Sequence, residues 1–222
     1  MKLTEFRIRH YRNVVDSGWV KVQRVTALVG QNEGGKSNLC EALYRLNPFE
    51  AEAAYNIDED WPADDWGGRD PSATVCEAKF ELSDRAAISE LFQASLTATK
   101  DATVTSEGAN ISEDGPAVMP DPPDSFEIVV ARKYSAPPIA SAAAPAGYEF
   151  KAAQLTGWVI ARLPKFVYIR DYELSGARIE LDHLASRQES VPWAQLSNEE
   201  QTILIVLQLA AINLPDFLAK GK

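Results

Sequence analysis

A glycine-rich run with a lysine and a serine is the part of this chain whose residue types and spacing could do chemistry. Residues 30–37 read GQNEGGKS and fit the pattern G-x-x-x-x-G-K-[ST] of a phosphate-binding loop. Glycines in such a loop let successive backbone N–H groups curl around a phosphate. The sequence therefore predicts a nucleoside triphosphate site, and the candidate contacts are Gly30, Gln31, Asn32, Glu33, Gly34, Gly35, Lys36 and Ser37.

The last two residues of the loop have distinct expected roles. Lys36 should reach the β- and γ-phosphates as a point charge, and the Ser37 hydroxyl should be a ligand of Mg²⁺. The expected ligands are thus ATP and Mg²⁺. The sequence shows no N-K-x-D-like guanine reader, but that absence does not decide between the bases, so GTP stays open.

The groups that would hydrolyse the nucleotide are not identified, so the catalytic residues remain unknown. A buried strand ending in a metal-binding carboxylate is normally required. The nearest candidate is FVYIRDYE at 166–173, where Arg170 interrupts the pattern. Asp171 and Glu173 would share one face of a strand, so two interpretations stay open: a degenerate metal site, or a strand that ends in a solvated turn.

The elements around the loop follow from the hydrophobic pattern. Alternation predicts a strand over 3–9, with Phe6 and Ile8 on its buried face, and a short partner strand over 18–22. The continuous apolar run 25–29 predicts a strand buried on both faces. Residues Leu39, Ala42, Leu43 and Leu46 then recur at helical spacing, which predicts a helix over 36–46 directly after the loop.

The remainder of the chain is less regular. Residues 50–68 are expected to be an exposed acidic excursion, 97–125 a long loop or weak hairpin, and 135–147 an Ala/Pro/Ser-rich linker. Strands are expected at 75–82, with Cys76, Ala78, Phe80 and Leu82 inward, at 126–133 and at 166–169. Helices are expected after the Ser83-Asp84 cap, over 148–163, and over 201–214 after a Ser197-x-x-Glu200 capping box. The last helix is apolar on nearly every side, so it should be enclosed by neighbours.

Charge and composition narrow the class of protein. Residues 1–47 carry eight Lys/Arg against four Asp/Glu, whereas the rest carries 14 against 28, so the basic part coincides with the loop. Cys40 and Cys76 are expected to be buried and unpaired, and the two histidines, His10 and His183, to be surface or hydrogen-bonded residues. There is no apolar leader or 18-residue apolar stretch, so a soluble cytoplasmic protein without a membrane partner is expected.

Two stretches resemble a known group of proteins. "LTEFRIRHYRNV" followed by "VTALVGQNEGGKSNLCEAL" is similar to the opening of ABC-type ATPase heads of the SMC, RecF and OLD class. His10 stands where that family often has Asn, which leaves Tyr11-Arg12-Asn13 in register. The later stretches "WPADDW" and "LPKFVYIRDYEL" look similar to OLD-like AAA-type ATPases, bacterial proteins often linked to DNA processing or phage defence.

The resemblance implies a fold and a site. The fold is α/β: a P-loop NTPase, the ABC/SMC-type head lobe with a mixed β-sheet around the loop helix, incomplete within this sequence. The implied organisation is a nucleotide-binding lobe at 1–134, the linker at 135–147, and at 148–222 the continuation of the lobe and the start of a helical insertion. The residues matching Arg12 and Asn13 would also approach the nucleotide.

The resemblance also implies partners. Family members sandwich ATP between two heads, so a homodimer of heads is expected in a full protein, with DNA bound through other parts of it. Two alternatives stay open: a non-hydrolysing nucleotide-binding regulatory module, and a truncated fragment without function.

Overall fold

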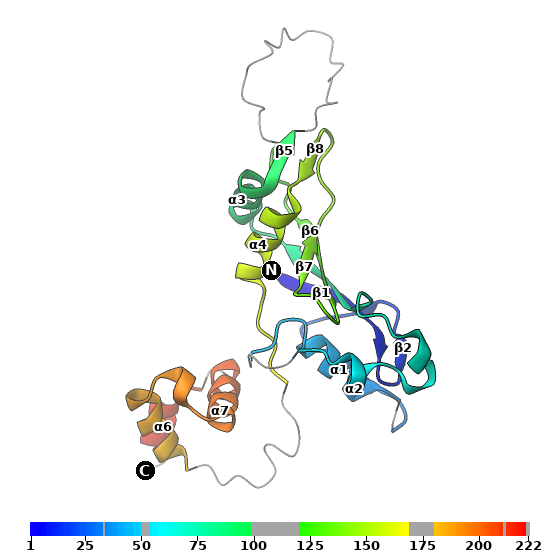
Figure 1. Cartoon of the computed structure of the whole chain (residues 1–222). Helices are drawn as coiled ribbons and strands as arrows, with labels where there is room; N and C mark the ends of the chain where they lie inside the picture. The colour runs from blue at the N-terminus through cyan, green and yellow to red at the C-terminus, as the bar shows by residue number, and fades with distance from the viewer. Residues whose placement is uncertain (33, 50–53, 99–119, 169–179, 211, 221–222) are drawn as a thin grey trace. The chain divides into compact units, whose positions relative to one another are not determined.

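The chain forms two compact units in this computed structural model, Met1–Phe166 and Val167–Lys222. The structure describes residues 1–32, 34–49, 54–98, 120–168, 180–210 and 212–220 (Figure 1). All strands in these ranges belong to the first unit, and the described part of the second unit is helical.

An antiparallel sheet lies at the centre of the first unit (Figure 1). Its strand order is β2-β1-β4-β6-β7, and β3 also pairs with β1. The strands are β1 Lys2–Tyr11, β2 Val14–Asp16, β3 Val20–Lys21, β4 Thr74–Leu82, β6 Phe126–Lys133 and β7 Ile139–Ser141. A separate antiparallel pair joins β5 (Leu96–Ala98) to β8 (Tyr148–Phe150). Every strand pairing in the described ranges is antiparallel, which differs from the mixed sheet expected.

The long strands follow the alternation in the sequence. In β1, Phe6 and Ile8 are buried and lie opposite Ala78 and Cys76 of β4. The predicted inward set of β4 is buried as well, which confirms that strand. Because burial of one such side chain is worth about 1.5–3 kcal/mol, this shared face fixes the register of the two strands.

Helices cover the first unit at several points. They are α1 Lys36–Tyr44, α2 Ile57–Asp60, the 3₁₀ helix η1 Ala63–Gly68, α3 Arg85–Ser95 and α4 Ala152–Arg162. The Asp84 side chain caps α3 by accepting a hydrogen bond from the backbone N–H of Ala86 (2.9 Å), as predicted. In Figure 1, α3 lies beside α4, and α4 lies beside β7.

The prediction of a strand at 25–29 is wrong. The structure has no strand there, and Val25 and Val29 are 85% and 93% exposed. An apolar run becomes a strand only where a neighbouring strand accepts its backbone N–H and C=O groups. Among the described residues no strand pairs with this run, so its composition alone does not produce a strand.

The acidic excursion expected at 50–68 is only partly exposed. Tyr55 and Trp61 are 6% and 4% exposed, and the Asp60 side chain is 1% exposed. Trp61 stacks on His10 with the ring planes 5° apart, and the Tyr55 hydroxyl donates a hydrogen bond to the Ala42 carbonyl (2.6 Å). The correction has a simple cause: aromatic residues between the acids anchor the segment on the core.

Three other segments also differ from expectation or lie outside the described ranges. The segment 135–147, expected to be a linker, contains β7, whose Ala140 is buried in the sheet. At 166–169 the described residues show only an isolated bridge from Phe166 to Pro48 instead of a strand. Residues 99–119 of the predicted long loop lie outside the described residues, as do Asp171 and Glu173.

The second unit is a small helical cluster with its own core of leucines. Its elements are α6 Leu181–Ser190, η2 Trp193–Gln195, α7 Asn198–Leu209 and α8 Leu214–Lys220, and its buried residues are Leu184, Leu196, Leu204 and Leu214. The predicted capping box is present at the start of α7. The helix expected over 201–214 is confirmed as far as Leu209, where α7 ends, and its predicted extent is wrong: Asn213 caps a new helix that contains Pro215. Val206 and Ile212 are each 38% exposed, so the described chain does not enclose this apolar segment.

The cysteines and the membrane expectation can be compared directly with the structure. Both cysteines are free; Cys76 is buried as predicted, but Cys40 is exposed, because it lies off the buried face of α1. Among the described helices, none has the length and apolar character needed to cross a bilayer.

Candidate functional site

The backbone of the glycine-rich loop turns sharply just before α1. The Gly34 N–H donates a hydrogen bond to the Gln31 carbonyl at 3.2 Å, and Gly35 has a φ of +82°. A Cβ at Gly35 would lie 2.9 Å from Asn13 Oδ1, and one at Gly34 would lie 3.0 Å from the Gln31 carbonyl oxygen. The loop therefore requires glycine at position 35 for backbone conformation and for space.

Lys36 is the first residue of α1, and its side chain folds back over the loop. The Nζ group donates hydrogen bonds to the carbonyls of Gly30 (2.8 Å) and Gln31 (2.5 Å). An ammonium group has three N–H donors, so these two described contacts leave one for an added acceptor. The lysine is thus held over the loop with its charge beside the loop backbone.

The N-terminus of α1 offers backbone donors to an anion. The N-cap, Gly35, provides no side-chain cap, and the first turn contains no acidic residue. The first N–H groups of a helix have no intrahelical partner, and the helix dipole places partial positive charge there. This end of α1 is therefore suited to a phosphate group.

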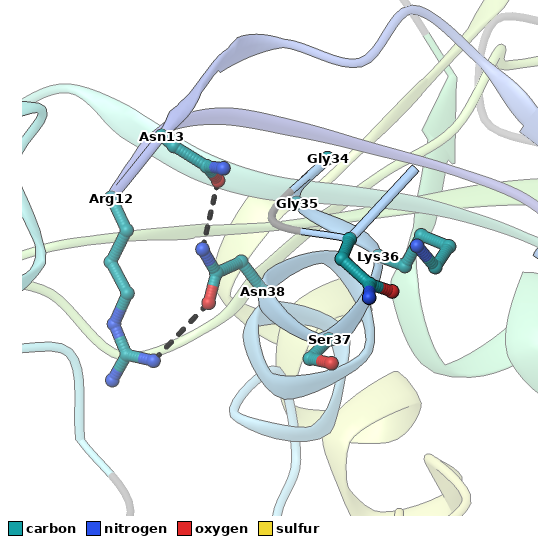
Figure 2. A pocket seen from close by; sticks show the side chains of 8 residues that line it. Arg12, Asn13, Gly34, Gly35, Lys36, Ser37 and Asn38 are labelled. Carbon is teal, nitrogen blue, oxygen red and sulfur yellow. Dashed lines mark hydrogen bonds between the residues drawn. The ribbon is translucent and has the colours of Figure 1, made fainter. Parts of the chain in front are cut away.

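An open cavity of about 590 Å³ lies at this helix end. Figure 2 shows that Arg12 and Asn13 approach it from the end of β1, while Lys36, Ser37 and Asn38 belong to the start of α1. The cavity is lined by Arg12, Asn13, Asn32, Gly34, Gly35, Lys36, Ser37 and Asn38. Its volume lies within the range of about 300–1,000 Å³ found for small-molecule sites.

Arg12 and Asn13 are joined through Asn38. The Asn38 Nδ2 group donates a hydrogen bond to Asn13 Oδ1 (2.8 Å), and Arg12 Nη1 donates one to Asn38 Oδ1 (3.3 Å) (Figure 2). Arg12 also forms a two-pronged pair with Glu41, at 2.7 and 3.0 Å. These contacts hold the arginine at the cavity wall with its side chain 36% exposed.

A cluster of four charges lies behind this wall. Glu41 and Asp60 each contact both Arg12 and Arg45. Burial alone would lower the pKa of Arg12, but its hydrogen bond to Glu41, the nearby Tyr11 hydroxyl and the two carboxylates raise it overall. Arg12 therefore stays positively charged while it faces the cavity.

The turn at the end of β1 has an unusual backbone. His10 and Arg12 have φ values of +48° and +53°, a region that residues other than glycine seldom adopt. Tyr11 between them is fully buried, with the Arg12 and Arg45 guanidinium groups over its ring. Burial is the main cause that raises the pKa of the Tyr11 hydroxyl, so this hydroxyl stays protonated. This turn directs Arg12 and Asn13 toward the loop.

Most of the candidate residues predicted from the sequence lie around this one cavity. Gly30 and Gln31 are not in its lining but hold Lys36 through their carbonyls, and Glu33 lies outside the described residues. The sequence reasoning missed Asn38, Glu41 and Asp60. One signal for Glu41 was available, because Arg45 follows it at the i+4 spacing of helical ion pairs.

The fit of a magnesium ion can be judged from Ser37. This residue is exposed at the first turn of α1 and lines the cavity, and a hydroxyl oxygen is a suitable ligand for Mg²⁺. The described residues contain no group of three or more His, Cys, Asp or Glu side chains placed to hold a metal. Mg²⁺ commonly takes few protein ligands and completes its shell with water and substrate phosphates, so Ser37 fits that role.

Comparisons with known proteins add little to the geometry. No protein-family model and no curated protein matches the chain. One solved structure, described as "Structural biochemistry of ATP-driven dimerization and DNA stimulated activation of SMC ATPases", is similar at 15% identity and a TM-score of 0.34. That alignment covers 92% of this chain and 98% of the other. The likeness is coarse, and neither the site nor its ligand follows from it.

Proposed function

We propose that this chain binds a nucleoside triphosphate, ATP with Mg²⁺, at the cavity between the glycine-rich loop and the end of β1. One observation carries the proposal: Lys36, the uncapped N-terminus of α1 and Arg12 all face one open cavity of about 590 Å³. Three sources of positive potential around one cavity favour a polyphosphate over a neutral ligand.

The residues would divide the work as follows. The free donor of Lys36 and the first N–H groups of α1 would bind phosphate oxygens from the loop side. Arg12 and Asn13 would bind from the β1 side, and Ser37 would hold Mg²⁺, which neutralises phosphate charge when bound. Gln31, Asn32 and Glu33 fill the variable positions of the loop, where Asn32 lines the cavity.

We further propose that the chain is the ATP-binding lobe of an SMC/OLD-like ATPase. This step rests on the sequence resemblance of its first 43 residues, in which β1, β2 and β3 precede the loop. Under this proposal hydrolysis requires a second half and a second head, and the complete protein acts in DNA processing or phage defence. The isolated chain should then bind ATP weakly and turn it over slowly.

The decisive experiment compares two lysine-to-alanine variants by calorimetry with MgATP. Lys36→Ala should abolish measurable binding, because it removes the charge held over the loop. Lys151→Ala is the matched control, since this exposed lysine precedes α4 and is not in the cavity lining. Unchanged affinity in Lys36→Ala would disprove the phosphate-loop assignment.

A second measurement separates the ATPase lobe from a non-hydrolysing module. Phosphate release is followed for this chain and for any longer reading frame that contains it. The lobe proposal expects the longer protein to hydrolyse ATP faster than this chain. Binding with equal, negligible turnover in both would favour the regulatory module, and competition by GTP would show whether the base is read.

A further inference from the structure

The position of Arg12 at the cavity wall is set in part by Asn38, which lines the cavity, and in part by two carboxylates that do not. Its guanidinium donates to Glu41 through both Nη atoms and to Asp60 through Nε (3.3 Å). Glu41 comes from α1 and Asp60 is the last residue of α2. The cavity lining includes Arg12 but neither carboxylate.

Asp60 holds the backbone of Arg12 as well as its side chain. The Arg12 N–H donates a hydrogen bond to the Asp60 carbonyl at 2.5 Å, and Arg12 has the unusual φ of +53°. The second carboxylate oxygen of Asp60 accepts hydrogen bonds from Arg45 Nη1 (2.6 Å) and from the Asn56 N–H (2.9 Å). Because these contacts hold the Asp60 side chain, which is 1% exposed, its orientation does not depend on Arg12 alone.

Charge explains why both carboxylates are needed. The two guanidinium groups of Arg12 and Arg45 share Glu41 and Asp60, so the four described side chains balance two positive charges with two negative ones. Neutralising one carboxylate leaves two guanidinium groups sharing a single buried negative charge. Because Arg12 is 36% exposed and Arg45 only 16%, Arg12 is the group that can turn away toward solvent.

We propose that Glu41 and Asp60 are positioning residues that hold Arg12 in the orientation needed to bind the polyphosphate of a nucleotide. This inference rests on the proposed function and deepens it. It gives the 54–61 segment a role at the site without direct contact with the ligand: the segment is anchored by Tyr55 and Trp61 and delivers Asp60 to Arg12.

The test is a double-mutant cycle on the full chain, measured as MgATP affinity. Arg12→Ala should lower the affinity about tenfold or more, as expected for a lost charge-assisted hydrogen bond to phosphate. Asp60→Asn should lower it about three- to tenfold when Arg12 is present, and less than about twofold in the Arg12→Ala background. Equal losses in the two backgrounds, or no loss in either, would overturn the proposal.

Two further variants provide a control and a substitute for Asp60→Asn. Asp58→Asn is the matched control, because Asp58 lies in the same short helix but is 73% exposed and pairs with Arg69 instead; its affinity should be unchanged. Glu41→Gln carries the same cycle if Asp60→Asn does not fold, since it also removes one of the two charges facing Arg12. A loss in Glu41→Gln that persists without Arg12 would equally overturn the proposal.

A readout that needs no nucleotide separates this inference from the proposed function. The NMR signal of Arg12 Nε–Hε should show slow rotation of the guanidinium in the wild type and faster rotation in Asp60→Asn. If the wild type binds no MgATP but shows this change, the proposed ligand fails and the positioning of Arg12 stands. A freely rotating Arg12 in the wild type would overturn the positioning itself.

Discussion

Replacing Gly35 by alanine tests the geometry of the loop most directly. An L-residue in the left-handed region costs about 1–2 kcal/mol, and the φ of Gly35 is +82°. The added Cβ would lie 2.9 Å from Asn13 Oδ1 and 3.2 Å from Val14 Cγ2, an overpacking that typically costs about 1–3 kcal/mol. The stiffer unfolded chain returns about 0.4–1 kcal/mol. The net expected loss in free energy of unfolding is therefore about 1–5 kcal/mol.

Two other glycines of the same unit provide matched controls for this change. Gly18 has a φ of +62° but no atom within 4 Å of an added Cβ, so Gly18→Ala measures the backbone strain without the clash. Gly157 lies inside α4, with open space around it and no positive φ, so alanine there should stabilise by about 0.5–1 kcal/mol. The difference between Gly35→Ala and Gly18→Ala then isolates the contact with Asn13 and Val14.

Urea unfolding followed by tryptophan fluorescence is the suitable assay. Four of the five tryptophans, Trp19, Trp61, Trp66 and Trp158, belong to the first unit, so the signal reports chiefly on the unit that carries all three glycines. The expected order of stability is Gly157→Ala, then wild type, then Gly18→Ala, then Gly35→Ala. A Gly35→Ala protein as stable as Gly18→Ala would refute the close approach of Asn13 to the loop. One as stable as wild type would refute the left-handed conformation as well.

Two further predictions concern ionisable groups. Burial raises the pKa of Cys76 to about 12, and desolvation also raises the pKa of the exposed Cys40. Iodoacetamide at pH 8 should therefore label Cys40 slowly and Cys76 only after unfolding, as followed by mass spectrometry. Prompt labelling of Cys76 in the folded protein would contradict this packing. The hydrogen bond from the Ser197 backbone N–H is the main cause that lowers the pKa of the Glu200 carboxylate below its usual 4.5. The contribution of this carboxylate to stability is therefore present above pH 4.5 and is lost as the pH falls through the lower pKa of the folded state. An NMR titration of Glu200 should have its midpoint below 4.5, and Glu200→Gln, which can still accept the capping hydrogen bond, should remove this pH dependence; a midpoint at or above 4.5 would show that the capping box is not formed.

Local sequence patterns predicted those helix caps and buried strand faces that depend only on residues close together in the chain. The alternation in β1 and β4 identified the buried faces because the side-chain period of a strand is two residues. The caps of α3 and α7 were also predicted, since Asp84 and Ser197 bond to backbone groups two or three residues away. These interactions depend only on neighbours in the sequence.

The predictions that were wrong concern segments whose structure depends on residues distant in the sequence. The run 25–29 has strand composition, yet pairing depends on a partner strand that the local sequence does not reveal. The segment 50–68 was expected to be acidic and exposed, yet Trp61 stacks on His10 and Asp60 is buried where it pairs with Arg12. In both cases the outcome depends on residues far apart in the chain.

The sequence by itself predicted a glycine-rich loop with Lys36 and Ser37 at the start of a helix, because the G-x-x-x-x-G-K-[ST] pattern and the helical spacing after it are local signals. Only the tertiary structure decided how that loop is completed. The structure places Arg12, which the family resemblance already indicated, at the cavity, and it alone puts Asp60 behind Arg12, 48 positions further along the chain. The physical reason is that buried charges must be paired, and the pairing partners are chosen by the packing of distant elements rather than by local spacing.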